Sequence, residues 1–288
     1  ERIRAEVAAW YAAHARPLPW REPGVSAWGV LVSEFMLQQT PAARVEPVWR
    51  EWVARWPSAA ALAAEEQGEA VRAWGRLGYP RRAQRLWRAA CLIVERFGGE
   101  VPSEIAELRE LPGVGEYTAA AVASFAHGRR HVVLDTNVRR VLARLDGGQA
   151  FEPASLSRDE RARAEAWLPE SAAAAALWAV ASMELGAQVC IATGRPACGA
   201  CPVAAECAWR AAGYPGWSGP ARRGETYAGT DRECRGALLA VLRDAPGPVP
   251  RERVLDAWRS DAEQAERALA SLLSDGLVRL DCASDLTL

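Results

Sequence analysis

The sequence predicts an all-α fold, and two observations lead to this prediction. Between residues 81 and 97, Leu86, Ala90 and Ile93 recur at helical spacing, with charged residues between them. No stretch alternates between apolar and polar residues, as a half-buried strand does, before about the last dozen residues of the chain. A length of 288 residues is enough for two domains.

Similar helical patterns run along the rest of the chain. They cover residues 3–13, 28–39, 47–55, 138–145 and 172–185. Residues 213–230 are rich in Gly, Pro and Arg and lack periodicity, which is typical of a linker. After it, helical patterns at 233–242, 251–258 and 262–274 and a strand-like segment at 277–280 indicate a small winged-helix-like module. This pattern fits a module that contacts DNA as well as one that only packs against the body.

We therefore expect a helical body over residues 1–212, a linker over 213–230 and a small tail over 231–288. The apolar runs are shorter than the roughly 20 residues that a bilayer crossing needs. No basic region, apolar run and cleavage site mark the N-terminus, so we expect neither secretion nor membrane insertion, and a cytoplasmic location.

The charged residues restrict the possible chemistry. All 35 residues counted as Lys or Arg are arginines, and the formal net charge is −1. The absence of lysine excludes a Schiff base on a lysine side chain. Because the overall charge is near neutral, any surface that binds DNA has to be local.

Four of the seven cysteines are clustered near the end of the predicted body. Cys190, Cys198, Cys201 and Cys207 have the spacing C-x7-C-x2-C-x5-C. Disulfides are disfavoured, because cellular thiols stay reduced in a chain without a secretory signal. Four thiolates satisfy a structural zinc ion and also an iron–sulfur cluster, and the spacing alone does not choose between them.

A glycine-containing turn separates two further helical patterns. The string Leu111-Pro112-Gly113-Val114-Gly115 lies between residues 104–109 and 117–126. Its two glycines allow a tight turn whose backbone amides point outward beside the positive end of the next helix. An anion fits there, and a DNA phosphate is the natural one, although a plain helix–helix turn uses the same glycines. The whole string is typical of a helix-hairpin-helix motif.

Two carboxylates are candidates for acid and base chemistry. Glu34 is embedded in a largely apolar helical stretch, where loss of solvation is expected to raise its pKa toward that of a general acid. The alternative is that Glu34 simply points outward. Asp135 follows an apolar stretch and precedes a helix, so it is either an N-cap residue or a functional carboxylate. One protonated and one ionised carboxylate are the pair that cleaves glycosidic bonds.

Together, these segments resemble the adenine DNA glycosylase family, the MutY-type branch of the helix-hairpin-helix glycosylases. The resemblance spans residues 10–209, and the tail resembles that of short actinobacterial members. Its most specific element is the string Glu34-Phe35-Met36-Leu37-Gln38-Gln39-Thr40. The others are Leu77-Gly78-Tyr79, residues 111–115 with Tyr117-Thr118-Ala119, residues 134–140, residues 183–187 and the clustered cysteines.

The resemblance implies a two-lobed helix-hairpin-helix DNA glycosylase fold with an iron–sulfur cluster loop. A six-helix lobe would cover about residues 22–130, and the N-terminal and cluster lobe residues 1–21 and 131–212. It also implies that the four cysteines bind a 4Fe–4S cluster. The implied partner is double-stranded DNA with adenine opposite 8-oxoguanine or guanine, bound by a monomer.

The implied reaction is hydrolysis of the adenine glycosidic bond in base excision repair, after the base has left the duplex. Glu34 matches the acid that protonates adenine at N7, and Asp135 matches the carboxylate that stabilises the cationic sugar. Tyr117 and Asn137 match supporting positions. Lyase relatives have a lysine where Tyr117 stands, so we expect a monofunctional glycosylase that does not cut the strand.

The resemblance also implies residues that contact DNA and the two bases. Arg21 and Glu184 match residues that line the adenine pocket. Gln39 and Tyr79 match residues that probe the position of the opposite purine. Other matched DNA-binding positions are Leu37, Gln38, Thr40, Gly113, Val114 and Gly115.

Three departures and two rival functions accompany the resemblance. The first cysteine spacing and the stretch after Arg21 (residues 22–25) are each one residue longer than usual. About sixty residues stand where many relatives carry a large domain that recognises 8-oxoguanine. One rival is a thymine or other mismatch glycosylase of the same fold, and Glu34 and Gln38-Gln39-Thr40 argue against it. The other is a non-enzymatic iron–sulfur DNA-binding protein. The presence of both Glu34 and Asp135 argues against it, because binding alone does not require them.

Overall fold

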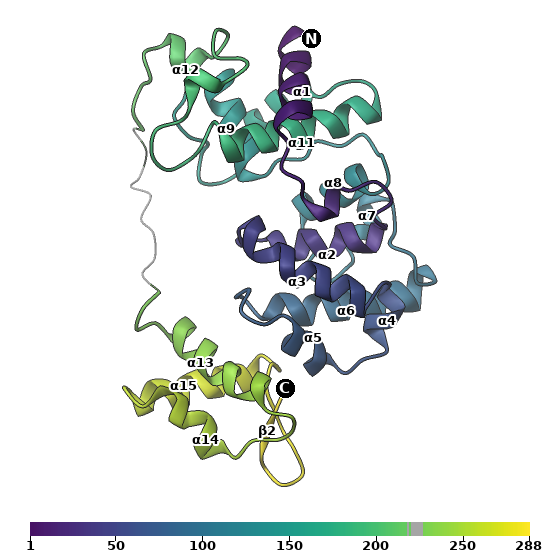
Figure 1. Ribbon diagram of the computed structural model, residues 1–288, viewed down its shortest axis with the longest axis vertical. Coiled ribbons are helices and arrows are strands. Elements are labelled where there is room, and N and C mark those ends of the chain that lie inside the picture. Colours follow the sequence, from purple (N-terminus) through teal and green to yellow (C-terminus); the bar gives the residue numbers. More distant parts are fainter. Residues whose placement is uncertain (218, 220–226) are drawn as a thin grey trace. The chain divides into compact units, whose positions relative to one another are not determined.

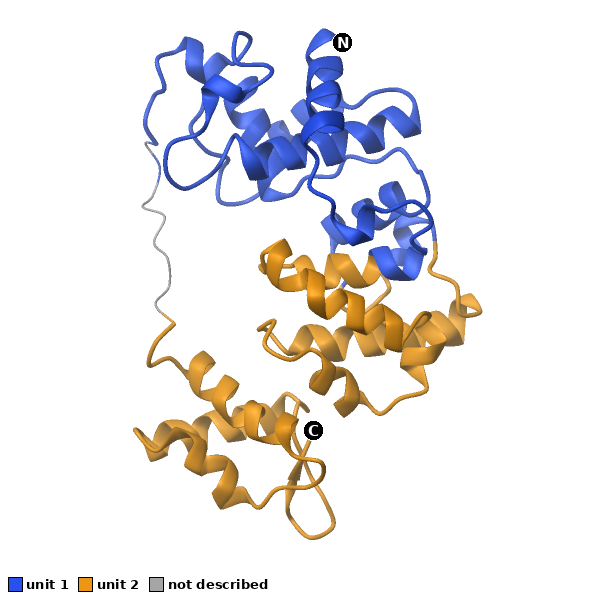
Figure 2. Ribbon diagram, in the orientation of Figure 1, with its two compact units in different colours: residues 1–30, 103–109, 114–221 blue, residues 31–102, 110–113, 222–288 orange. Residues whose placement is uncertain are grey.

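The computed structural model describes residues 1–217, 219 and 227–288, whose regular structure is almost entirely helical (Figure 1). The all-α class expected from the sequence is confirmed. The chain forms two compact units (Figure 2). Unit 1 comprises residues 1–30, 103–109 and 114–221, and unit 2 comprises residues 31–102, 110–113 and 222–288. None of the described helices combines the length and the apolar character that a membrane span requires.

Unit 1 is built around three packed helices. Its elements are α1 (Arg2–His14), η1 (Pro19–Arg21), α7 (Ile105–Leu108), α8 (Glu116–Phe125), α9 (Thr136–Leu145), α10 (Arg158–Trp167), α11 (Ala172–Gln188), η2 (Cys198–Ala200) and α12 (Ala208–Ala211). Val7 from α1, Val141 from α9 and Leu185 from α11 meet in one buried apolar cluster. Burial of these helix faces supplies the main stabilising free energy of this unit.

Unit 2 contains most of the remaining helices. α2 (Ala27–Leu37) begins in unit 1 and continues into unit 2. The other elements of unit 2 are α3 (Ala42–Arg55), α4 (Ala59–Ala63), α5 (Gln67–Ala73), α6 (Arg81–Phe97), α13 (Asp231–Asp244), α14 (Arg251–Leu255), η3 (Asp256–Trp258), α15 (Ala262–Ser274), β1 (Arg279–Leu280) and β2 (Leu286–Thr287). Trp52 is packed edge-to-face against Trp56 and Trp74, with ring centroids 4.7 and 5.6 Å apart. These buried indoles form the centre of the helices that follow α2.

The C-terminal module has the three helices that the sequence predicts, followed by a short hairpin. β1 and β2 pair antiparallel, and Leu238, Leu269 and Leu286 are buried in the module. It also packs against α5 and α6 within unit 2, where Gln84 Nε2 donates to the Gly276 carbonyl at 2.7 Å. The division into body, linker and tail stays a prediction, and linker residues 218 and 220–226 lie outside the described residues.

Candidate active site

Glu34 lies on α2, and only 5% of its surface is exposed. Its neighbours Phe35 and Met36 are fully buried. The alternative in which Glu34 points outward is therefore wrong. Burial provides the loss of solvation that a raised pKa requires, and the raised pKa itself stays a prediction.

Asp135 is held by two hydrogen bonds at the start of α9. Its Oδ1 accepts from the Val138 amide at 2.7 Å, so Asp135 is indeed an N-cap residue. Its Oδ2 accepts from Asn137 Nδ2 at 2.6 Å. Burial raises the pKa of Asp135, while the Val138 amide, the Asn137 amide and the charge of Arg140 act in the opposite direction. Asp135 is therefore an N-cap residue, and its role as a functional carboxylate stays a prediction.

Arg140 fixes the orientation of Asn137. The Arg140 side chain is buried, and its Nη2 donates to Asn137 Oδ1 and to the Gly186 carbonyl, both at 2.7 Å. Because the Asn137 oxygen accepts from Arg140, its amide nitrogen faces Asp135. A Cβ on Gly186 would lie 2.7 Å from Asn137 Cβ, so a side chain at position 186 would push Asn137 away. Sequence reasoning assigned no role to Arg140, although its helical i, i+3 spacing from Asn137 was a usable signal.

Glu184 lies on α11 with a side chain that is fully buried. Arg21 Nη1 donates to its Oε2 at 2.8 Å, and Arg16 Nη2 donates to the same oxygen at 3.0 Å. Burial alone would raise the pKa of Glu184, but the bonds and charges of Arg16 and Arg21 lower it to about 2. The structure thus brings Arg21 and Glu184 together. Sequence reasoning missed Arg16, because nothing in its local pattern distinguishes it.

Gln39 and Tyr79 both adopt left-handed backbone conformations, with φ of 57° and 49°. Such values are uncommon for residues other than glycine and require support from the surroundings. The support comes from Arg82 on α6, which is 5% exposed. Sequence reasoning missed Arg82 because it follows Arg81 and reads as part of a polar helix face.

Arg82 joins the segment after α2 to the turn that carries Tyr79. Its Nη1 donates to the carbonyls of Phe35 (3.0 Å), Met36 (2.9 Å) and Gln38. Its Nη2 donates to Thr40 Oγ1 at 2.9 Å and to the Gly78 carbonyl at 3.0 Å. Burial lowers the pKa of Arg82 to about 10, so the group stays charged at neutral pH. The predicted residues Gln38, Thr40 and Tyr79 therefore lie around one buried cation, with Leu37 directly beside them in the chain.

The glycine turn has the geometry expected of a hairpin. Gly113 has φ of +90°, and a Cβ there would lie 2.7 Å from Phe35 Cε1. Only glycine both adopts this backbone conformation readily and leaves room for the Phe35 ring. Gly115 is the N-cap of α8, with Val114 just before it. Phosphate binding at this turn stays a prediction.

Tyr117 lies on α8 in unit 1. It packs against an apolar cluster that includes Val133, two residues before Asp135. Its placement agrees with a supporting position, and its role stays a prediction.

Three of the four clustered cysteines pack against the core that contains α9 and α11. Cys190, Cys201 and Cys207 pack against the apolar cluster of unit 1, and Arg144 Nη1 donates to Cys190 Sγ at 3.3 Å. Burial, with the charges of the other three cysteines, raises the pKa of Cys201 to about 11. A metal has to displace the proton of such a thiol. Soft thiolate donors suit iron–sulfur and zinc alike. Among the described residues, no three His, Cys, Asp or Glu side chains converge on a position for a single metal ion.

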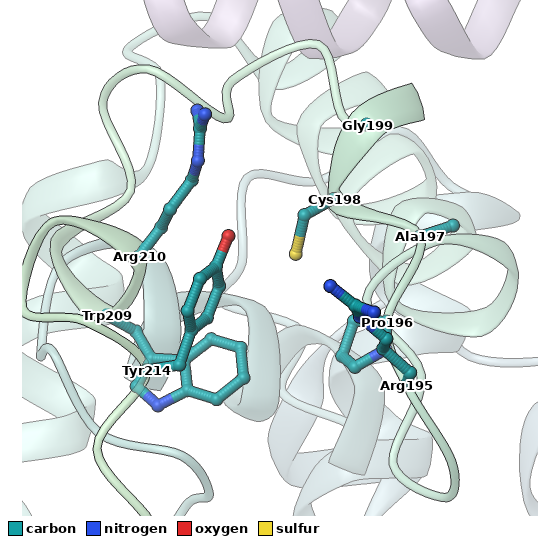
Figure 3. Close-up of a pocket in the computed structure, with 8 residues that line it drawn as sticks. All are labelled: Arg195, Pro196, Ala197, Cys198, Gly199, Trp209, Arg210 and Tyr214. Atoms are coloured by element: carbon teal, nitrogen blue, oxygen red, sulfur yellow. The ribbon is translucent and has the colours of Figure 1, made fainter.

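Cys198 borders a cavity of about 530 Å³ (Figure 3). Its sulfur points into the space between Arg195 and Tyr214. The lining residues are Arg195, Pro196, Ala197, Cys198, Gly199, Trp209, Arg210 and Tyr214. Of the four clustered cysteines, Cys198 alone lines this cavity. The donor set of four thiols is compatible with a bound cluster.

Comparison with known proteins decides the family. Residues 32–167 match the model of the HhH-GPD superfamily base excision DNA repair protein. The adenine DNA glycosylase of Mycobacterium tuberculosis strain H37Rv is 54% identical over 270 residues, which cover 94% of this chain and 88% of that protein. This chain belongs to the adenine DNA glycosylase family. The glycosylase of Mycolicibacterium smegmatis is 52% identical, over 95% of this chain and 91% of that protein.

The helix-hairpin-helix fold expected for an adenine DNA glycosylase is also confirmed. A thermostable thymine-DNA glycosylase superposes with a TM-score of 0.65 at 23% identity, over 73% of this chain and 98% of that one. A trapped endonuclease III–DNA covalent intermediate gives 0.62 at 21% identity, over 74% of this chain and 96% of that one. At these identities the likeness shows the fold alone. The human adenine DNA glycosylase is 38% identical over 71% of this chain and 39% of the human protein.

Proposed function

We propose that this protein removes adenine paired with 8-oxoguanine or guanine from duplex DNA by hydrolysis and leaves the strand intact. Support for adenine as the target comes from the mycobacterial relatives, which are adenine DNA glycosylases that align over nearly the whole chain. The observation that carries the chemistry is the carboxylate of Asp135, held in a fixed orientation inside unit 1.

The reaction breaks the bond between adenine N9 and the sugar C1′. Glu34 donates a proton to N7 of adenine, so that the base leaves with the bonding electron pair. The ionised Asp135 stabilises the positive charge that develops on the sugar. Water then adds to C1′ and gives up a proton, which leaves an abasic site.

The Asp135 geometry suits this electrostatic role. Burial strengthens the attraction between the carboxylate and a cationic sugar, because the surroundings screen charge less than water does. The bonds from Val138 and Asn137 favour the ionised form and fix the direction of both oxygens. The ion cluster of Glu184 and Arg21 supplies a fixed polar wall, as an adenine pocket requires.

The remaining predicted residues receive roles in binding. Gln39 and Tyr79 contact the opposite purine, and residues 113–115 bind a backbone phosphate. The four cysteines would hold a 4Fe–4S cluster, which when bound cross-links the loop that contains them. Arg140 and Arg144 bond to Cys190, so they connect that loop to α9.

Other features of the proposal follow from the composition and the substrate. A chain without lysine has no side-chain amine for lyase chemistry, which supports a monofunctional glycosylase. Because the proposed substrate is genomic DNA, we infer a bacterial cytoplasmic location, in association with the nucleoid. We also infer that the protein acts as a monomer.

Substitution of the proposed acid tests this mechanism. Glu34→Gln keeps the size of the side chain but supplies no acidic proton, so single-turnover adenine release should fall at least about a hundredfold. Affinity for the duplex should stay within a few-fold. Glu46→Gln, on the exposed ion pair with Arg50, is the matched control and should release adenine normally. Normal release by Glu34→Gln would show that the acid is assigned wrongly.

A further inference from the structure

We propose that the C-terminal module sets the selectivity for the opposite base through Arg232, a positioning residue for Tyr79. This inference rests on the proposed function, in which Tyr79 contacts the opposite purine. No motif in the sequence pointed to Arg232.

Arg232 is the second residue of α13, and it reaches the ring and hydroxyl of Tyr79. Its Nη1 donates to Tyr79 Oη at 2.9 Å, and its guanidinium carbon lies 5.7 Å from the centre of the Tyr79 ring. The guanidinium also lies 5.6 Å from the centre of the Tyr227 ring. A hydrogen bond and a cation–π contact thus act on the same tyrosine.

Tyr79 needs such support to present one orientation. It is 42% exposed and its backbone is left-handed. Arg82, which is anchored to backbone carbonyls, lies 5.5 Å from the centre of the same ring. Arg82 therefore fixes the backbone end of Tyr79, and Arg232 fixes its hydroxyl end.

Hydrogen bonds and ion pairs hold the C-terminal module against α5 and α6. Arg72 Nη1 donates to the carbonyls of Leu242 at 3.0 Å and Ala245 at 2.8 Å, at the C-terminal end of α13. A cation at this end of a helix is favoured by the helix dipole. Asp275 pairs with Arg81 of α6 and with Arg235 of α13. Because these contacts tie α13 to α5 and α6, Arg232 is held in a defined place.

Close backbone packing adds to this docking. A Cβ on Gly68 of α5 would lie 2.7 Å from the carbonyl oxygen of Leu288. Gln67 Nε2 and Gln84 Nε2 both donate to the Gly276 carbonyl, at 3.0 and 2.7 Å. The C-terminal module thus packs closely against α5 and α6.

The bond from Arg232 determines what the Tyr79 hydroxyl offers to DNA. A phenol oxygen that accepts from a guanidinium keeps its own proton for donation, and the nearby positive charge strengthens that donation. 8-Oxoguanine has an acceptor oxygen at C8 that guanine lacks. We therefore infer that Arg232 makes Tyr79 favour 8-oxoguanine over guanine.

The test compares release and binding for the two opposite bases. The wild type, Arg232→Ala, Arg232→Lys, Tyr79→Phe and the double variant Tyr79→Phe/Arg232→Ala would be assayed for adenine release opposite 8-oxoguanine and guanine. Binding would be measured to duplexes with a tetrahydrofuran abasic-site analogue opposite each base. Arg232→Ala should reduce the 8-oxoguanine-to-guanine ratio about fivefold, Arg232→Lys should keep part of it, and the double variant should lose no more than Tyr79→Phe.

The control is Arg251→Ala, which removes an exposed ion pair with Glu266 on the same module and should leave the ratio unchanged. An equal loss for both opposite bases, or an unchanged ratio in Arg232→Ala, would overturn the inference. If the wild type released no adenine, the proposed function would fail. The binding ratio would then still decide whether Arg232 acts on the choice of opposite base.

Discussion

Asn137 connects a carboxylate to a buried cation with one amide group. Its nitrogen donates to Asp135 and its oxygen accepts from Arg140, so rotating the amide by half a turn would lose both bonds. Glycine at position 186 leaves the space that this arrangement needs. The geometry of Asp135 therefore depends on residues that do not themselves react.

Replacing Asn137 should change the pH dependence of adenine release. In the proposed mechanism Asp135 acts as the anion, so the rate should fall as the pH drops through its pKa. Asn137→Ala removes a bond that favours the anion, which raises this pKa further. The acid limb of the single-turnover rate profile should therefore move to higher pH by about one unit. Arg130→Ala, at an exposed ion pair, is the control. An unmoved acid limb would contradict the role given to Asn137.

The low pKa of Glu184 predicts acid sensitivity of the fold. Its pKa falls from an ordinary value of 4.5 to about 2 on folding. The stabilisation is therefore complete above about pH 4.5 and is lost as the pH falls toward 2. Its size is roughly 3 kcal/mol. Denaturant unfolding at pH 6 and pH 3 should show this loss in the wild type.

Glu184→Gln supplies the comparison for that experiment. The variant should be less stable at pH 6, because the buried end of Arg21 loses its carboxylate, and its stability should depend less on pH. The same pH dependence in variant and wild type would show that Glu184 is not the group responsible.

At the level of elements, Arg82 of α6 joins two short segments that local sequence does not stabilise. The segment directly after α2 and the turn at residues 77–79 each contain a left-handed residue that is not glycine, Gln39 and Tyr79. Their carbonyls accept hydrogen bonds from the same guanidinium. Each hydrogen bond to a charged donor contributes about 1.5–3 kcal/mol.

Replacing Arg82 should loosen both segments together. Arg82→Met keeps much of the buried volume but donates no hydrogen bonds, so the free energy of unfolding should fall by at least about 3 kcal/mol. Amide hydrogen exchange should rise most at residues 37–40 and 77–79. Arg85→Met, three residues along the same helix, serves as the comparison. A uniform rise in exchange throughout the molecule would contradict the specific role of Arg82.

Helices with strong periodicity could be predicted from the sequence, and buried cations could not. The prediction of a helix at residues 81–97 agrees with α6, because its apolar face is continuous. Arg82 and Arg140 lie on the same kind of helix, yet each donates to a backbone carbonyl that is 47 or 46 residues away in the chain. Periodicity records which residues are apolar. It does not record which polar side chains find partners after folding.

The residues of the candidate site also fall into those that the sequence could predict and those that it could not. The motifs identified Glu34, Asp135, Arg21 and Glu184, because their residue types and spacings match a known family. The partners that orient them, such as Arg16, have no local signal. The contact between the C-terminal module and α5 and α6 was left open by the sequence, since the module's helices are compatible with either DNA contact or packing.

For the whole molecule, a net charge of −1 does not by itself attract DNA. Several arginines, including Arg82, Arg140 and Arg144, are buried and bond to the protein's own carbonyls. In the proposed function, binding to DNA then depends on local features such as the turn at residues 111–115 and the residues around Tyr79.

The most direct measurement is single-turnover base release from four short duplexes, with adenine opposite 8-oxoguanine, guanine, cytosine or thymine. Strand breaks after hot alkali report abasic sites, and an untreated sample reports lyase cleavage. We predict release opposite 8-oxoguanine and guanine, with breaks only after alkali. No release from any duplex, by protein shown to bind DNA, would contradict the proposed function, and breaks without alkali would contradict its monofunctional chemistry.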